Sequence, residues 1–452
     1  MKRSHEIDMT SGPLLKQILL FVLPLIASSI LQLLFNAADV IVVGKFAGSL
    51  ALAAVGSNTS LIMLIVNLFI GISTGANVLV SRYFGSREQE QLTQCVHSSI
   101  GLSAVLGVMV CILGFFISEP MLHLMNVAPE VLPLAALYLK IYFLGTPATL
   151  IYNFGAAILR AVGDTERPLR FLSISGVVNV VLNLVLVIVF HMSVAGVAIA
   201  TAVSQYVAAI LVLRCLAHSK GDYRLHIRSI RLHGSMVWQL LLVGLPAGLQ
   251  SSVFSISNVL IQSSINTFGY VTMAANSASG NLDGFVYVSI NAVHYAALSF
   301  TSQNYGARQF ERIKKVFLNC FTVVAVIGIL VGTLVYLFGP QLLSLYISAS
   351  DPDRNAIIAT GMIRLKIICL TYFLCGLMDT ASGALRGLGK SWSPMIISAL
   401  GACVFRIIWI YTLFAAFHSL DMLYISYPIS WIITTIVLFL HLFFTYRKLT
   451  KV

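Results

Sequence analysis

The chain has 452 residues, of which 58% are hydrophobic and only 10% are charged. This composition excludes a soluble protein of that length and is typical of an integral membrane protein. The formal net charge of +12 is confined to short stretches between apolar segments, a distribution that argues against a nucleic-acid-binding surface.

A transmembrane helix needs roughly 20 apolar residues, and about twelve continuous segments of that kind follow one another along the chain. A membrane β-barrel would instead show short segments of alternating polarity. We therefore predict an all-α integral membrane protein. The segments are centred within 17–43, 52–80, 95–117, 132–158, 169–190, 194–216, 237–262, 272–302, 317–347, 358–385, 394–415 and 423–446.

Most Lys and Arg residues lie at the two termini and in the loops that follow even-numbered segments, which places both termini in the cytoplasm by the positive-inside rule. The largest basic group lies between the sixth and seventh segments. It consists of Arg214, Lys220, Arg224, Arg228 and Arg231.

The sequence contains an internal duplication. Residues 48–54 match 269–275, 81–87 match 302–308, and 159–168 match 385–394. Repeats of this kind are typical of secondary transporters, and a repeat with an even number of helices gives two lobes related by an axis along the membrane normal. We predict twelve transmembrane helices in two six-helix lobes related by such a pseudo-twofold axis. The expected parts are an N-terminal lobe (1–216), a basic cytoplasmic linker (217–236) and a C-terminal lobe (237–452).

No loop is long enough for a soluble catalytic domain, and no catalytic constellation such as paired Asp or Ser with His is present. The Gly387–Ser391 run resembles a phosphate loop, but Ala384 stands where that loop needs a glycine. The seven cysteines have no metal-ligand spacing. We therefore predict a protein that is not an enzyme and has no cofactor, and whose energy comes from an ion gradient or from the gradient of its substrate.

Asp39 is the strongest candidate for an ion-binding residue in the first half. It lies in an apolar stretch, where a charged side chain costs on the order of 2.5–3.5 kcal/mol. Gln32 and Asn36 share its helix face. The fifth segment adds Asn179 and Asn183, and the sixth adds Thr201 and Gln205. Such oxygens around a carboxylate suit Na⁺, or the carboxylate takes up a proton. The alternative is that these polar side chains only form hydrogen bonds that hold neighbouring helices together.

The seventh segment carries a polar stripe without an acid, whereas the eighth and tenth carry acids. These side chains are candidates for lining a cavity that attracts an organic cation. The alternatives are that Asp283 lies near the outer water interface and that Asp379 pairs with Arg406. The candidates are Asn258, Gln262, Asp283, Tyr287, Asn291, His294 and Asp379.

Small residues and prolines mark contacts and bends. The pairs Gly71/Gly75 and Gly280/Gly284 predict close helix packing. Pro24 occupies the matching point of the first segment to Pro246 in the seventh, and each is expected to kink its helix. A bend at Pro24 either couples protonation of Asp39 to a change in the shape of the first helix or is a static kink.

From about Leu14 to Tyr446 the chain resembles the multidrug and toxic compound extrusion transporters, in the DNA-damage-inducible-protein-F-like branch of bacterial members. The residues that carry the resemblance are Pro24, Asn36-x-x-Asp39-x-x-x-x-Gly44, Ala53-Ala54, Leu159-Arg160-x-x-Gly163-Asp164, Asn179-x-x-x-Asn183, Gly196-x-Ala198-x-Ala200-Thr201, Ser302-Gln303-Asn304-Tyr305-Gly306-Ala307 and Ala384-Leu385-Arg386-Gly387-Leu388-Gly389.

The resemblance implies alternating access of two six-helix lobes and export of cationic amphiphiles against H⁺ or Na⁺. It implies a cation site formed by Asp39, Asn179, Asn183 and Thr201, and a first helix that bends at Pro24. The family often has Asp where this chain has Asn183, which makes Na⁺ less favoured. The expected setting is the bacterial cytoplasmic (inner) membrane, with both termini cytoplasmic, small cationic substrates and a monomer. The alternative function is a flippase for lipid-linked precursors.

Overall fold

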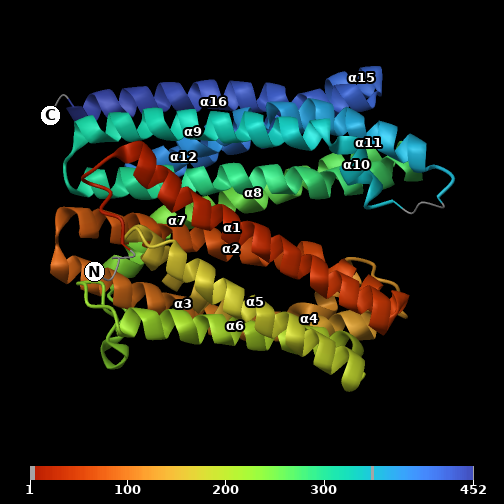
Figure 1. Cartoon of the computed structure of the whole chain (residues 1–452), viewed down its shortest axis with the longest axis horizontal. Coiled ribbons are helices and arrows are strands. Elements are labelled where there is room, and N and C mark those ends of the chain that lie inside the picture. The colour runs from red at the N-terminus through yellow and green to blue at the C-terminus, as the bar shows by residue number, and fades with distance from the viewer. Residues whose placement is uncertain (1–5, 348–350, 451–452) are drawn as a thin grey trace. The chain divides into compact units, whose positions relative to one another are not determined.

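The computed structural model describes residues 6–347 and 351–450 of the chain (Figure 1). This part consists of helices and contains no strand. The α-helices are α1 (Leu14–Val42), α2 (Ser49–Ser86), α3 (Gln89–Leu124), α4 (Leu132–Ala161), α5 (Glu166–Leu184), α6 (Ser193–Ala217), α7 (Gly234–Asn266), α8 (Tyr270–Gly306), α9 (Phe310–Leu337), α10 (Gly339–Ser344), α11 (Arg354–Ile368), α12 (Tyr372–Gly387), α13 (Trp392–Ser398), α14 (Phe405–Trp409), α15 (Ala415–Phe417) and α16 (Leu420–Thr450).

Short segments of other helix types join several of these elements. The π-helical segments are η1 (Val43–Ala47), η2 (Val185–Val189), η5 (Ala399–Val404) and η6 (Ile410–Phe414), and the 3₁₀ segments are η3 (Ile227–Ser229) and η4 (Cys369–Thr371). As a result α11, η4 and α12 form one long span, and α13 to α15 form another.

The predicted all-α membrane fold is confirmed. Eleven helical segments of the described chain are long and apolar enough to cross a membrane. Helix α8 has the required length, with 37 residues, but carries more polar side chains. The ninth segment is centred within the predicted range of 317–347, with α9 ending at Leu337 and Pro340 lying at the start of α10. Proline is tolerated in the first turn of a helix, where its missing backbone N–H would have no intrahelical partner.

The duplication is visible in the backbone as well as in the sequence. Gly48 and Gly269 precede α2 and α8 with φ of 89° and 88°. Arg87 and Arg308 follow the same two helices with φ of 60° and 55°. Such left-handed values are uncommon outside glycine, so their recurrence at matching positions indicates that the two copies have kept the same turns.

The helices pack into two units that exchange parts of α1 and α7. Unit 1 comprises the chain up to Asp8 and Ala27–Gly248, and unit 2 comprises Met9–Ile26 and Leu249–Val452. Both crossings fall two residues after a proline inside a helix, Pro24 in α1 and Pro246 in α7. The packing units therefore differ from the predicted sequence boundaries, which describe the duplicated copies.

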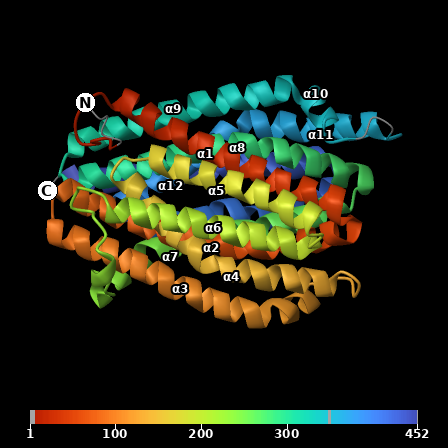
Figure 2. The same cartoon turned by 60° about the horizontal axis from the view of Figure 1, so that its bottom comes forward.

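Within unit 1, α4 packs against α3, α6 and α2, and Figure 2 shows α3, α4 and α6 running alongside one another. Glycines bring α2 and the first half of α7 together. A Cβ on Gly71 would lie 2.3 Å from the backbone of Gly248, and one on Gly75 would lie 2.3 Å from the carbonyl oxygen of Leu240. This confirms the predicted packing role of Gly71 and Gly75.

Within unit 2, α8 packs against α9, α11 and α12. The first half of α1 belongs to the same unit: the ring of Phe21 packs edge-on against that of Phe300 in α8, with centroids 5.6 Å apart. The second predicted glycine pair behaves differently, because a Cβ on Gly284 would meet nothing within 4 Å. The prediction of close packing at Gly284 is therefore wrong.

Candidate functional site

A chain of hydrogen bonds in unit 1 joins four of the residues selected from the sequence. The side-chain amide of Asn183 donates to Oδ1 of Asp39 and, over 3.3 Å, to Oδ1 of Asn179. The amide of Asn179 donates to the hydroxyl of Thr201 over 3.4 Å. Helices α1, α5 and α6 thus supply one continuous polar cluster, which we call the Asp39 cluster.

Helix geometry explains how these residues meet. Asn179 and Asn183 are one turn apart on α5, and both are buried. Nearby, α1 and α5 approach closely because α5 has Gly176, where a Cβ would overlap the ring of Phe35. The carboxylate of Asp39 is half-buried, and the Tyr138 side chain of α4 lies near it.

Both helices that carry the acid and its amide partner change type soon afterwards. Four residues beyond Asp39, α1 passes into η1, and two residues beyond Asn183, α5 passes into η2. Short π-helical segments are rare and occur frequently at functional sites. The Asp39 cluster therefore lies beside two helix irregularities of that kind.

The other predicted residues of the first half take no part in these hydrogen bonds. Gln32 and Asn36 on α1 are exposed, and Gln205 on α6 is half-buried. Pro24 lies within α1, which continues through it. Although Gln32, Asn36 and Asp39 were predicted to share one face of α1, Asp39 is the member of this group that the structure shows bonded to an amide of α5.

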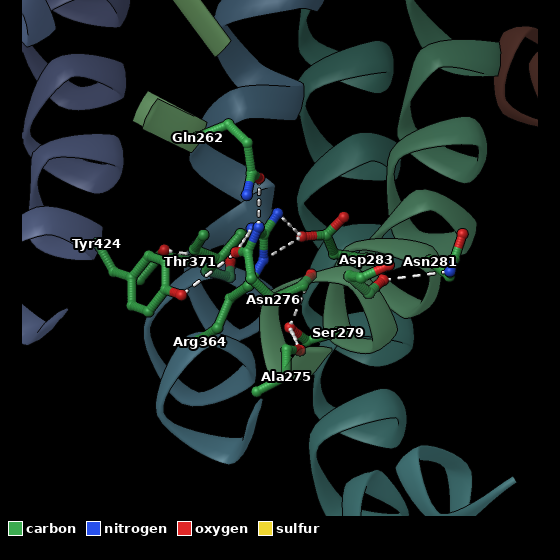
Figure 3. A network of polar contacts seen from close by, with 11 residues as sticks. Gln262, Ala275, Asn276, Ser279, Asn281, Asp283, Arg364, Thr371 and Tyr424 are labelled. Carbon is green, nitrogen blue, oxygen red and sulfur yellow. Dashed lines mark hydrogen bonds and ion pairs between the residues drawn. The ribbon is translucent and has the colours of Figure 1, made fainter. Parts of the chain in front are cut away.

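A second polar cluster lies in unit 2 and centres on a residue that the sequence analysis missed (Figure 3). Arg364 on α11 donates from Nε and Nη2 to Oδ2 of Asp283 on α8, at 3.0 and 2.6 Å. Its Nη1 donates to Oδ1 of Asn276, which also accepts from the hydroxyl of Tyr424 at 3.2 Å. The amide of Asn276 donates to Oε1 of Gln262 at 2.7 Å.

This arrangement changes the interpretation of Asp283. Its side chain is only 8% exposed and its charge is compensated by the Arg364 guanidinium, so it is not a free acid for an organic cation. Asp39 was chosen as a candidate site residue because it is a charged residue inside an apolar span. Arg364 has the same property and could have been chosen for the same reason. The sequence could not show that α8 and α11 bring Asp283 and Arg364 together.

The remaining candidates of the second half form a separate group. The ring nitrogen Nδ1 of His294 lies 2.6 Å from the carbonyl oxygen of Asp379, and the amide of Asn291 donates to the hydroxyl of Tyr287 at 3.4 Å. Asp379 interacts electrostatically with Arg386, and no ion pair joins it to Arg406 within the described residues. Asn258 is exposed on α7.

The described residues contain no group of three or more His, Cys, Asp or Glu that could hold a metal ion. In unit 1 one half-buried carboxylate, that of Asp39, accepts a hydrogen bond from the amide of Asn183. In unit 2 Asp283 forms an ion pair with Arg364. Together with the duplicated helices, charged groups of this kind inside apolar spans are typical of a multi-span membrane transporter.

Comparison with known proteins agrees with this class. The sequence pattern of the MatE family matches residues 24–185 and 246–412, so the chain belongs to this family of membrane transporters. Transporters of this family are not enzymes. The expected branch within the family stays a prediction.

Individual relatives cover most of the chain. It is 27% identical over 400 residues to the probable multidrug resistance protein YpnP of Bacillus subtilis, covering 88% of each chain. It is 24% identical over 397 residues to the probable multidrug resistance protein NorM of Thermotoga maritima, covering 87% of this chain and 84% of that protein. A multidrug resistance MATE family transporter solved in an outward-facing conformation has the same fold, with a TM-score of 0.91, 24% identity and 100% of both chains covered.

Proposed function

We propose that this transporter exports cationic amphiphilic compounds, including drugs, by alternating access, in exchange for an ion that binds at Asp39. The observation that carries the proposal is the hydrogen-bonded Asp39 cluster, which ties one membrane-embedded carboxylate to amides of α5 and a hydroxyl of α6. Binding of the ion and of the substrate would then favour different arrangements of the protein, which is the linkage that exchange requires.

The cluster favours H⁺ as the coupling ion. Asn183 presents its amide N–H to Asp39, and a hard cation such as Na⁺ binds oxygen and is repelled by N–H. A proton needs only the carboxylate itself. The amide oxygen of Asn183 is buried and has no hydrogen-bond partner in the part of the chain that the structure describes, so rotation of this amide would give a protonated Asp39 an acceptor.

The relatives support the choice of substrate class, since both curated proteins compared above are named as probable multidrug resistance proteins. We place the protein in the bacterial cytoplasmic membrane as a monomer with both termini in the cytoplasm. The cation would contact polar groups of unit 2 that are not held in an ion pair, such as the exposed side chains of Tyr287 and Asn258 and the half-buried Asn291.

The test is transport of ethidium in proteoliposomes under an imposed pH gradient or an imposed Na⁺ gradient. We expect the pH gradient to drive ethidium movement and the Asp39→Asn variant to lose it by at least about tenfold, because the neutral amide cannot carry the proton. The matched control is Glu119→Gln, which removes an exposed carboxylate that pairs with Lys140.

Transport that continues unchanged in a folded Asp39→Asn variant would refute the site. A response to Na⁺ alone would refute the proton but keep the site. The alternative function, a flippase, gains one observation from the structure, namely three buried or largely buried arginines in unit 2: Arg364, Arg386 and Arg406. Absence of transport of any cation by the unmodified protein, together with movement of a labelled lipid pyrophosphate, would favour it.

A further inference from the structure

Inside unit 2 the buried arginines outnumber the carboxylates that compensate their charge. Asp283 is paired with Arg364, and Asp379 has Arg386 as its electrostatic partner. Arg406 on α14 is only 2% exposed, and no ion pair to it is found within the described residues. A guanidinium stays charged at any accessible pH, so this span carries one buried positive charge without a carboxylate.

The surroundings of Arg406 provide interaction partners for only part of its guanidinium group. Its Nε donates to the hydroxyl of Ser430 at 2.9 Å, and its plane lies over the ring of Tyr427 at 4.1 Å and near that of Trp431 at 5.7 Å. Its Nη2 is buried and has no hydrogen-bond partner within the described residues. Aromatic faces stabilise a cation, but they do not accept its remaining N–H groups as an anion does.

A buried hydroxyl lies in the same region. Ser257 on α7 is buried and hydrogen-bonds with the thiol of Cys403, which is within electrostatic range of Arg406. A thiol is a weak hydrogen-bond partner, so this hydroxyl could turn to a stronger acceptor. Buried polar groups in folded proteins are almost always satisfied, so the open donor on the uncompensated Arg406 guanidinium points to a missing acceptor.

The backbone around Arg406 is also unusual. The π-helical segments η5 and η6 lie directly before and after α14. Arg406 therefore lies on a short α-helical segment between two π-helical ones. Such segments are rare and concentrate at functional sites. A change of either segment to α-helix would turn α14 about its axis and give Arg406 access to a different face.

We propose that Arg406, with Ser257 nearby, forms an oxyanion-binding subsite of unit 2 for the carboxylate or phosphate group of a substrate or of a lipid. Ser430 positions the guanidinium, since its hydroxyl accepts from Arg406 and donates to the carbonyl of Tyr427. Guanidinium groups bind such oxyanions through paired N–H donors. The subsite extends the proposed function from organic cations to zwitterionic compounds.

The first experiment measures anion binding by fluorescence. A Trp238→Phe/Trp392→Phe background removes the two exposed tryptophans and leaves Trp409 and Trp431, both buried. Iodide quenches indole fluorescence, so we expect saturable quenching of the purified protein in phosphatidylcholine nanodiscs. Arg406→Met should raise the iodide concentration for half-quenching at least about tenfold, since the charge is lost. The matched control, Arg447→Met, removes an arginine at the end of α16 and should change nothing.

Two arms separate the sources of the oxyanion. Competition with iodide by inorganic phosphate or acetate would identify a group carried by a soluble substrate. Weaker iodide binding in nanodiscs that contain phosphatidylglycerol would identify a lipid headgroup. If Arg406→Met does not fold, Arg406→Lys decides, because it keeps the charge and loses the paired donors, and the phosphate or acetate concentration that displaces iodide should rise several-fold. Quenching that is linear in iodide, or equal in the background protein and the folded Arg406 variants, would overturn the proposal.

A transport arm rests on the function proposed above. Rhodamine 110 has a free carboxyl group, and rhodamine 123 is its methyl ester, so the pair differs at the proposed contact alone. Arg406→Met should lower the ratio of rhodamine 110 to rhodamine 123 transport at least about fivefold. An unchanged ratio would contradict recognition of the carboxylate. No transport of either dye by the unmodified protein would instead count against the proposed function, and the iodide measurement would still decide the subsite.

Discussion

Asn183 on α5 donates a hydrogen bond to the carboxylate of Asp39 on α1, 144 positions earlier in the chain. The same amide nitrogen also donates to Asn179, so one side chain holds the acid and orients the next amide. In this orientation the N–H of Asn183, and not its oxygen, faces the carboxylate of Asp39.

Asn183→Asp should create a Na⁺ response. The change replaces an N–H donor with a second carboxylate, and hard cations favour negatively charged oxygens. We expect an imposed Na⁺ gradient to drive ethidium transport in the variant and not in the unmodified protein. The measurement is transport against Na⁺ concentration at fixed pH. Identical Na⁺ curves would show that residue 183 does not contact the ion.

Thr201→Val should weaken coupling without abolishing it. Valine keeps the shape of threonine but removes the hydroxyl that accepts from Asn179, and a lost side-chain hydrogen bond costs about 0.5–1.5 kcal/mol. Transport driven by a pH gradient should fall about threefold to tenfold. Thr149→Val is the matched control, since that hydroxyl bonds only to a carbonyl of its own helix α4. Equal losses in both variants would make the effect one of general stability.

Arg364→Met should destabilise the protein strongly. Removing one partner of a buried ion pair leaves the other charge uncompensated, at a cost of about 3–5 kcal/mol. Thermal unfolding in detergent should show a lower Tm, and Asp283→Asn in the same chain should restore much of it. The exposed pair of Lys140 and Glu119 offers a control, because breaking it should cost less than about 1 kcal/mol. A double variant no better than Arg364→Met would contradict a pairwise role.

Gly248→Val should be poorly tolerated. A Cβ at this position would lie 2.4 Å from the carbonyl oxygen of Leu68 on α2, so α7 would have to move away, and overpacking of this kind costs about 1–3 kcal/mol. Gly284→Ala tests the opposite case, because a Cβ there meets nothing within 4 Å and alanine favours helix. It should be neutral or stabilise by roughly 0.5–1 kcal/mol. Similar Tm values for both variants would refute the packing argument.

Tyr223→Phe should flatten the alkaline limb of the stability curve. Burial and the hydrogen bond to Glu6 raise the pKa of Tyr223 to about 12 from its ordinary value of 10.0. The folded protein thus holds this proton more tightly than the unfolded chain. The contribution is complete below about pH 10 and is lost as the pH rises to about 12. The measurement is Tm against pH for both proteins. A parallel fall above pH 10 would refute the assignment.

Sequence patterns predicted the spans well, since a helix in a bilayer has to be apolar over its length. They predicted less about interruptions, because η5 and η6 in the span of residues 392–417 depend on packing against neighbouring helices. Residues of one helix face were found by spacing, as with Asn179 and Asn183 on α5. Pairs on different helices were not: Asp283 and Arg364 are 81 positions apart, and no periodicity connects them.

The exchange of helix halves bears on how such a protein arose. Unit 1 takes in the first half of α7, and unit 2 takes in Met9–Ile26, which contains the corresponding part of α1, so neither packing unit is made from one copy of the repeat. This is the arrangement of a domain-swapped dimer whose two subunits have been joined end to end. A single copy expressed alone would lack its partner's helix half, and the linker at 217–236 would be the place to split the chain into two co-expressed fragments that reassemble.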